Sequence, residues 1–226
     1  ISPSRFLITK MVEGGYAKDK FYHIPTFAYF PQQLNVNKIH NQIVYACRIE
    51  YVKGVHVLLS AVNILKKNHY TELKLKIAGN GEEKYIASLK FFCSKQNLHN
   101  VEFIGNLKKN ILQNLLQEST FSVIPSLWYD NLPNSALESL SCGTPVIASA
   151  HGCFAELVKE EETGSLFKPG DADDLAEKMK KLLINQEQCV FMSRKSVEFI
   201  KQQHSPELHY ENLMSVVKKI ISKKLI

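Results

Sequence analysis

Two cations that could bind phosphate stand close together in segment 48–54, which reads RIEYVKG. Arg48 can bind two phosphate oxygens at once through its planar guanidinium group, and Lys53 adds a compact positive charge. The segment joins an expected strand to an expected helix, and the free backbone amides of a helix start favour an anion. Arg48 and Lys53 could therefore hold a diphosphate together, although a pair of solvated surface cations explains the segment equally well.

Two carboxylates form the second candidate group. Asp130 and Glu138 flank Pro133, whose fixed φ suits the first turn of a helix, so Asp130 falls in the preceding loop and Glu138 inside the helix. Their backbones would lie on the order of 10 to 15 Å apart, which is too far for the acid and nucleophile of a glycosidase. This spacing matches carboxylates that bind hydroxyls at opposite ends of a ligand as large as a nucleotide sugar. Helix-start carboxylates that favour the dipole explain the pair in isolation.

The elements that must position these residues are short apolar runs that alternate with amphipathic stretches. The helical pattern is clear in 55–67 and 82–96, where apolar residues recur on one face. Such repeats predict an α/β fold, a Rossmann-like parallel sheet with helices on both faces. The expected strands are Ile43 to Cys47, Leu73 to Ala78, Val101 to Ile104, Phe121 to Ile124, Pro145 to Ala148 and Ser165 to Phe167.

Ligands of an open parallel sheet bind beyond the carboxyl ends of its strands. Small, polar and basic residues follow the expected strands there, including Arg48, Gly79 and Gly105-Asn106, and they suit a phosphorylated ligand lying across the sheet. Glycines are also common in such turns for purely structural reasons. Lys84 replaces the third glycine of a dinucleotide-binding fingerprint, and no P-loop motif occurs, so nicotinamide binding and P-loop phosphoryl transfer are not supported.

The two ends of the chain differ from this pattern. Ser2 and Pro3 predict the start of a short helix that Gly14 ends, and residues 26–41 have no period and predict a linker. After Asp174 the chain is expected to be mostly helical. Its last amphipathic stretch, with four lysines between 218 and 224, either packs on a domain or lies on an anionic membrane.

Composition narrows the classes of protein. The chain has 226 residues, a net charge of +6 and 45% hydrophobic residues, which excludes a disordered or collagen-like protein. No stretch is apolar enough to span a bilayer. The five cysteines are widely spaced, which predicts reduced thiols in a cytoplasmic protein and no zinc site. No arginine-rich stripe with interleaved aromatics occurs, so nucleic acid is not an expected partner.

The motifs taken together resemble the nucleotide-sugar-binding half of retaining glycosyltransferases of the GT-B fold, glycosyltransferase family 4. The resemblance extends from about Ser2 to about Met214. Asp130 and Glu138 occupy the family's E-x7-E positions. The other matching segments are RI and KG at 48–54, IAGNG at 77–81, VEFIG at 101–105, PS at 125–126, SCGTPVIAS at 141–149, ELV at 156–158, and TG with PGD at 163–171.

The resemblance implies a role for each matching residue in a donor site that includes Gly79. Arg48 and Lys53 would bind the diphosphate and neutralise it as a leaving group, while Asp130 would bind the transferred sugar and Glu138 the ribose. The base would lie beside Gly105, Asn106 and Leu107, and the backbone from Asn131 through Leu132 and Pro133 to Asn134 would approach the sugar. Neither a metal ion nor an organic cofactor is implied.

The sequence departs from the family at the site and in length. Cys47 and Cys153 replace glycines, Asp130 replaces the longer glutamate, and Ala155 stands where proline is common. We expect residues 1–25 to be the end of an N-terminal acceptor domain, 26–41 a linker, and 42–226 the donor-binding domain with C-terminal helices.

The expected function is hexosyl transfer from a nucleoside-diphosphate sugar to a glycan or lipid-linked acceptor in polysaccharide or glycolipid biosynthesis. The expected location is cytoplasmic, with peripheral contact at the inner face of the membrane as the alternative described above. The chain without its N-terminal domain should be inactive. A GT-B nucleotide-sugar epimerase and a non-catalytic nucleotide-sugar-binding module remain as alternatives.

Overall fold

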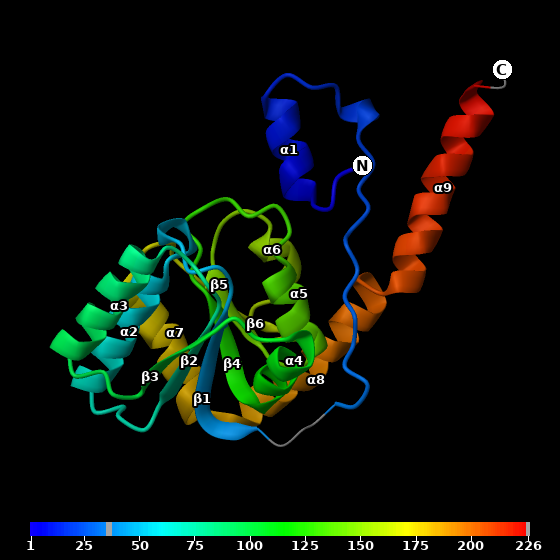
Figure 1. Cartoon of the computed structure of the whole chain (residues 1–226). Coiled ribbons are helices and arrows are strands. Elements are labelled where there is room, and N and C mark those ends of the chain that lie inside the picture. The colour runs from blue at the N-terminus through cyan, green and yellow to red at the C-terminus, as the bar shows by residue number, and fades with distance from the viewer. Residues whose placement is uncertain (35–37, 225–226) are drawn as a thin grey trace.

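The computed structural model describes residues 1–34 and 38–224, which form a six-stranded parallel sheet of order β3-β2-β1-β4-β5-β6 (Figure 1). Every neighbouring pair of strands is parallel. The predicted α/β, Rossmann-like fold with a helical C-terminal end is therefore confirmed. The strands are β1 (Ile39–Ala46), β2 (Lys74–Ala78), β3 (Val101–Gly105), β4 (Ser119–Ile124), β5 (Val146–Ser149) and β6 (Gly164–Phe167).

Helices cover both faces of this sheet (Figure 1). One core cluster joins the sheet to α2, α3, α7 and the first half of α8, and two further clusters join its other face to α4, α5, α6 and the end of α8. The helices are α1 (Arg5–Glu13), α2 (Val55–Lys67), α3 (Glu83–Lys95), α4 (Lys109–Glu118), α5 (Asn134–Ser141), α6 (Phe154–Leu157), α7 (Ala172–Ile184), α8 (Gln186–Gln203) and α9 (Pro206–Lys224), with 3-10 turns η1 (Lys18–Lys20) and η2 (Tyr51–Lys53).

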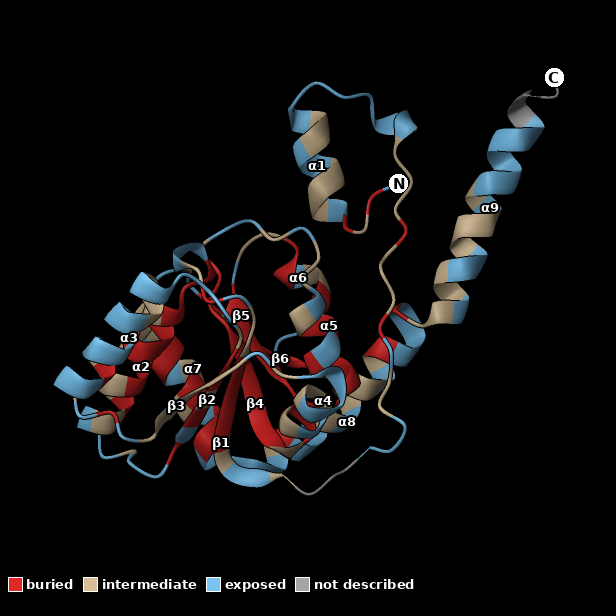
Figure 2. Cartoon of the chain, in the orientation of Figure 1, coloured by how far each residue is buried: buried red, intermediate tan, exposed pale blue. Residues whose placement is uncertain are grey.

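The sheet is buried on both faces because side chains alternate along each strand. In β1, Ile43 and Tyr45 join the cluster under α2, whereas Val44 joins the cluster under α4. All six residues of β4 are buried. Figure 2 shows buried residues concentrated in the strands and in the helix surfaces beside them. This packing gives the loops at the carboxyl ends of the strands a rigid base.

The element bounds differ from the predictions mainly at strand starts. β1 begins at Ile39, four residues before the predicted start and inside the range predicted as linker. Sequence analysis did not identify α4, although Leu112, Leu115 and Leu116 face the sheet. Residues 35–37 of the predicted linker and 225–226 at the predicted helical end lie outside the described residues.

The first helix begins two residues later than predicted. Ser4 caps α1, because its hydroxyl accepts the amide hydrogen of Leu7. Ser2 instead pairs with His23, its amide donating to the carbonyl of Tyr22 and that of Ile24 donating to the Ser2 carbonyl. The prediction that Ser2 caps this helix is therefore wrong, whereas the end at Gly14 is confirmed.

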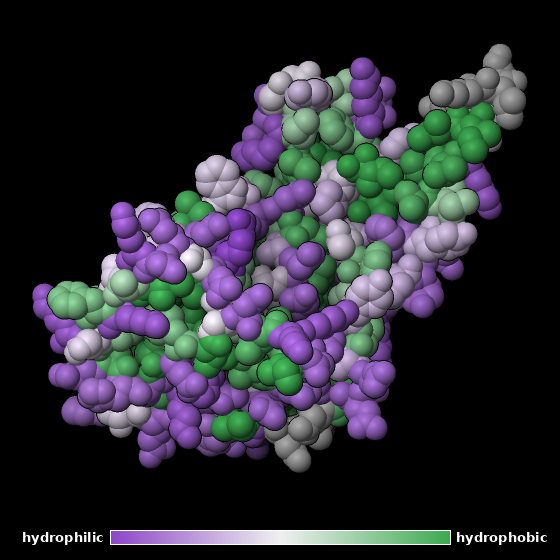
Figure 3. All heavy atoms as spheres, in the orientation of Figure 1, coloured by the Kyte–Doolittle hydropathy of each residue, from purple (hydrophilic) through white to green (hydrophobic). Residues whose placement is uncertain are grey.

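The C-terminal helices hold the segment that precedes β1. The Nδ1–H groups of His204 and His209 donate to the carbonyls of Thr26 and Pro25 at 2.8 and 2.7 Å. The outer part of α9 carries exposed apolar side chains, including Ile220 and Ile221. Figure 3 shows a green, hydrophobic surface over this helix. In the described part of the chain, none of the helices is both long enough and apolar enough to cross a bilayer.

Candidate functional site

The candidate site lies where the order of the strands reverses. From β1 the chain moves outward to β2 and β3, and it then returns to β4 on the other side of β1. Ligands of open parallel sheets bind at such a switch point, beyond the carboxyl ends of the strands. Arg48 follows β1 and Asp130 follows β4, so the predicted residues lie on both sides of this point.

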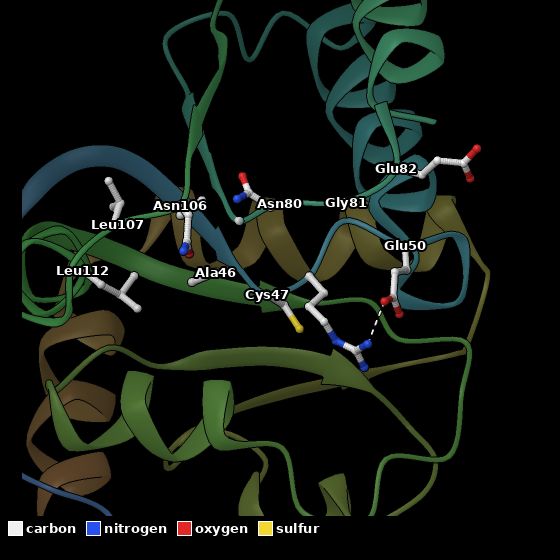
Figure 4. Close-up of a pocket in the computed structure, with 12 residues that line it drawn as sticks. Ala46, Cys47, Glu50, Asn80, Gly81, Glu82, Asn106, Leu107 and Leu112 are labelled. Atoms are coloured by element: carbon white, nitrogen blue, oxygen red, sulfur yellow. Dashed lines mark hydrogen bonds and ion pairs between the residues drawn. The ribbon is translucent and has the colours of Figure 1, made fainter. Parts of the chain in front are cut away.

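An open cleft of about 770 Å³ lies beyond the carboxyl ends of β1, β2 and β3 (Figure 4). Arg48, Gly79, Asn106 and Leu107, which are all predicted site residues, line it together. Gly105 does not line the cleft, but its carbonyl accepts the amide hydrogen of Gly79, which does, at 2.8 Å. The volume is within the usual range for sites of small molecules and cofactors.

Arg48 projects from the wall of this cleft toward solvent. Its Nη1 donates to Oε1 of Glu50 at 2.7 Å, the contact drawn as a dashed line in Figure 4, and 70% of its side chain is exposed. An exposed ion pair of this kind contributes little to stability, so the guanidinium group can exchange Glu50 for a ligand at low cost. Sequence analysis did not identify Glu50 as its partner.

Glycines bring the loops of the site into close contact. Gly54 has φ +71°, and a Cβ atom there would lie 1.9 Å from the carbonyl oxygen of Pro125. Gly79 has φ +140°, and its Cβ atom would lie 1.9 Å from the carbonyl oxygen of Cys47. Only glycine accommodates both the positive φ and the contact. The close approach at Gly54 places the neighbouring Lys53 beside the loop that follows β4.

The ammonium group of Lys53 forms an ion pair with Oδ1 of Asp130. The two side chains are only 11% and 14% exposed. Two predicted site residues that are 77 positions apart therefore meet directly. Because the pair is largely desolvated, each charge depends on the other far more than in the exposed pair of Arg48.

Two thiols lie close to this ion pair. Burial raises the pKa of Cys47, while the nearby charges of Lys53 and Arg48 oppose the rise. Burial and the charge of Asp130 raise the pKa of Cys153 to about 12. Both thiols are therefore neutral near pH 7. Cys47 also lines the cleft, so the ion pair of Lys53 and Asp130 lies close to the wall of the cleft.

The loop after β4 is held in place by backbone contacts. The amide of Leu127 donates to the carbonyl of Val52 at 2.8 Å, and Nε2 of His151 lies 2.8 Å from the carbonyl oxygen of Ser126. The amide of Cys153 donates to the carbonyl of Asp130 at 3.3 Å. These contacts fix the loop to η2 on one side and to the end of β5 on the other.

Three buried side-chain oxygens of the described residues lack a hydrogen-bond partner: Oδ2 of Asp130, Oγ of Ser135 and Oγ of Ser149. Asp130 follows β4, Ser135 lies in the first turn of α5, and Ser149 ends β5, so all three belong to the carboxyl edge. Buried polar groups are normally hydrogen-bonded. A polar ligand at this edge would therefore gain contacts that the protein alone does not make.

Glu138 lies in a neighbouring pocket of about 360 Å³, together with Asn134, Tyr29 and Lys109. Leu112 lines both this pocket and the larger cleft, so the two adjoin. Partial burial raises the pKa of Glu138, and the charge of Lys109 opposes the rise. Sequence analysis missed Lys109 and Tyr29, because no local motif distinguishes them from surface residues.

The loop between Asp130 and α5 contacts the N-terminal segment. Ser4 Oγ donates to Oδ1 of Asn131 at 2.7 Å, and the carboxylate of Glu156 accepts the amide hydrogens of Arg5 and Phe6 at 2.9 and 2.7 Å. Leu132 packs against the core under α5, and Pro133 takes the cap position of that helix without a side-chain hydrogen bond. Sequence analysis did not identify the contacts of Ser4 and Glu156.

No group of three or more His, Cys, Asp or Glu side chains within residues 1–34 and 38–224 is arranged to hold a metal ion. Asp171-Ala172-Asp173 has the Asp-x-Asp spacing of some metal sites, but Asp171 caps α7 by accepting the amide hydrogen of Asp174. The absence of a metal ion from the reaction remains a prediction.

Comparison with known proteins identifies one matching family. The family described as Glycosyl transferases group 1 matches residues 28–199. An uncharacterized glycosyltransferase of Methanocaldococcus jannaschii is 30% identical over 148 residues, which cover 65% of this chain and 37% of the relative. Glycogen synthase of Mycobacterium tuberculosis is 31% identical over 146 residues, covering 63% of this chain and 34% of the relative. The alignments thus span well under half of these curated relatives.

The solved structures support the assignment of the fold. HepE of Anabaena, crystallised in complex with UDP and glucose, superposes with a TM-score of 0.81 at 16% identity. The match covers 98% of this chain and 62% of HepE.

Proposed function

The chain belongs to the glycosyl transferases group 1 family, and from this premise we propose that it is the donor-binding part of a retaining enzyme of glycosyltransferase family 4. The enzyme transfers a hexose from a nucleoside diphosphate to a glycan or lipid-linked acceptor in polysaccharide or glycolipid biosynthesis. Residues 42–226 belong to the donor domain together with 39–41, which form the start of β1, so the linker is shortened to 26–38, and residues 1–25 are the end of an acceptor domain. The proposed location is cytoplasmic, with peripheral contact at the inner face of the membrane as the alternative.

The observation that carries this proposal is that the ion pair of Lys53 with Asp130 lies at the same switch point as Arg48, which lines a cleft of about 770 Å³. The arrangement provides two cations for a diphosphate and a carboxylate for sugar hydroxyls. The structural neighbour HepE has also been crystallised with UDP-glucose, which supports a nucleotide sugar as the ligand class.

Arg48 and Lys53 would act on the leaving group. As the bond between the anomeric carbon and the diphosphate oxygen breaks, negative charge increases on the diphosphate. Positive charges held against the diphosphate stabilise that charge more in the transition state than in the ground state. The uncapped start of α5 adds backbone N–H groups that favour an anion. The proposal assigns no step to a metal ion or an organic cofactor.

The nucleoside would occupy the end of the cleft and the adjoining pocket of Glu138. Asn106 and Leu107 line the end of the cleft next to Leu112, where the base would pack. On the other side of Leu112, the carboxylate of Glu138 would accept hydrogen bonds from the ribose hydroxyls. Gly79 would allow the diphosphate to approach the backbone, and the segment from Asn131 to Asn134 would face the sugar.

Titration calorimetry with uridine, guanosine and adenosine diphosphates tests this function. We expect one of them to bind, and Lys53→Ala to weaken it about tenfold or more, because a charge-assisted phosphate contact is lost. Lys95→Ala is the matched control, since Lys95 is an exposed lysine in the last turn of α3. Failure of all three nucleotides to bind the wild-type chain would refute the proposal.

A transfer assay tests the division of the enzyme. We expect this chain to bind donor without transferring the sugar, because positioning of donor and acceptor supplies on the order of 7 to 11 kcal/mol of barrier reduction. The assay compares this chain with a longer form that carries an acceptor domain, using one donor and a crude acceptor extract. Equal turnover would show that residues 1–226 already contain the acceptor site.

A further inference from the structure

The ion pair between Lys53 and Asp130 creates competition within the proposed donor site. The ammonium group of Lys53 contacts Oδ1 of Asp130, and both side chains are largely buried. A diphosphate that recruits Lys53 must weaken this contact. It also brings negative charge toward a carboxylate in a site where water screens charges poorly.

Asp130 has little else in the protein to contact once Lys53 moves away. Its Oδ2 is already buried without a hydrogen-bond partner. Its backbone carbonyl accepts from Cys153, which holds the residue in place but leaves the carboxylate unsatisfied. A buried carboxylate that loses its counter-charge is strongly destabilised unless new donors reach it.

An intact donor carries sugar hydroxyls next to its diphosphate, where they can donate to Asp130, whereas the ribose hydroxyls of a free nucleoside diphosphate are assigned to Glu138 in the adjoining pocket. Building on the proposed function, we infer that Asp130 makes diphosphate binding depend on the attached sugar. When the intact donor binds, Lys53 turns to the diphosphate and sugar hydroxyls donate to Asp130. When the sugar has left, Asp130 draws Lys53 back and the nucleoside diphosphate is released. Asp130 is thereby the specificity-determining residue that distinguishes donor from product.

The ratio of two dissociation constants measures this coupling. UDP is compared with UDP-glucose, and GDP with GDP-mannose, by titration calorimetry on the wild-type chain and on Asp130→Asn. In the wild type we expect the matching sugar nucleotide to bind about tenfold more tightly than its diphosphate. Asp130→Asn removes the competing charge at nearly constant shape, so the diphosphate should bind several-fold more tightly and the ratio should fall toward one.

Three further variants separate this role from a structural one. Asp130→Glu keeps a carboxylate and should retain most of the ratio. Glu102→Gln disrupts the Lys76–Glu102 pair between β2 and β3, and it should leave the ratio unchanged. If Asp130→Asn does not fold, Lys53→Gln with Asp130→Asn removes both charges. That double variant should bind both ligands weakly and with similar affinity.

The outcomes distinguish this inference from the proposed function. Two results would overturn the inference and leave the proposed donor site intact. Either the wild-type chain binds diphosphate and sugar nucleotide with similar dissociation constants, or Asp130→Asn leaves the ratio of these constants unchanged. If Asp130→Asn lowers the affinity for diphosphate and for sugar nucleotide equally, Asp130 is a structural residue, and this result would also overturn the inference. Absence of all nucleotide binding by the wild-type chain would refute the proposed function and this inference together.

Discussion

Replacing Lys53 with Met should destabilise the fold strongly, because it leaves the charge of Asp130 buried without its partner. The two side chains are 11% and 14% exposed, so little solvent can compensate. Removing one member of a buried ion pair typically lowers the free energy of unfolding by 3 to 5 kcal/mol, and the residual exposure places our expectation near the lower end, at about 3 kcal/mol. The double variant Lys53→Met with Asp130→Leu should recover most of this loss, since neither charge remains.

Urea denaturation followed by circular dichroism measures these changes, provided that the slope of the transition is the same in all variants. Lys10→Met is the control, because Lys10 pairs with Glu13 in solvent at 47% and 55% exposure, and its loss should leave the urea midpoint unchanged. A loss below about 1 kcal/mol for Lys53→Met, or a double variant no more stable than the single one, would refute the description of this pair as desolvated and mutually dependent.

Three other changes probe different parts of the structure. Glu138→Gln should weaken nucleoside-diphosphate binding about tenfold in calorimetry without changing the urea midpoint. An altered midpoint with unchanged affinity would mean that Glu138 stabilises α5 and does not bind the ligand. Glu156→Gln should loosen the start of α1 and lower stability by about 1 kcal/mol, because the Glu156 carboxylate accepts two amide hydrogens there. Ser4 and Phe6 of this segment contact Asn131 and Tyr129, so the emission of Trp128, the single tryptophan of the chain, should change, and unchanged emission would contradict the coupling of α1 to the loop after β4. Burial lowers the pKa of His204 below its ordinary value of 6.5, so its contribution to stability is complete above that value and falls as the pH drops through 6.5 toward the folded pKa. His204→Asn should flatten this dependence in urea titrations between about pH 7 and 5, and an identical slope in both proteins would show that His204 does not titrate there.

The sequence predicted the sheet and the position of its ligand edge because both follow from strong patterns. Buried parallel strands such as β4 appear as short apolar runs, and the carboxyl ends of parallel strands meet at one edge. Arg48, Gly79 and Asn106 could thus be assigned to one cleft before any coordinates were known.

Contacts made by distant residues could not be predicted in the same way. The pairing of Lys53 with Asp130 depends on Gly54 fitting against Pro125, a backbone approach that no local spacing encodes. Ser4, rather than Ser2, caps α1 because Ser2 is held by a bridge to His23. Tertiary contacts of this kind override local capping preferences.

The proposed site for a nucleoside diphosphate is the carboxyl edge of the sheet, between the loops that follow β1 and β4. Nuclear magnetic resonance of the isotope-labelled chain, titrated with the nucleotide that calorimetry selects, locates the bound nucleotide residue by residue. Binding at this site predicts saturable shifts of the amide signals in segments 47–54, 79–81, 105–107 and 130–134. It predicts no shifts at the opposite edge, where Lys38 and Arg194 line another pocket of about 470 Å³. Shifts confined to the Lys38 and Arg194 pocket, or scattered shifts that do not saturate, would contradict it.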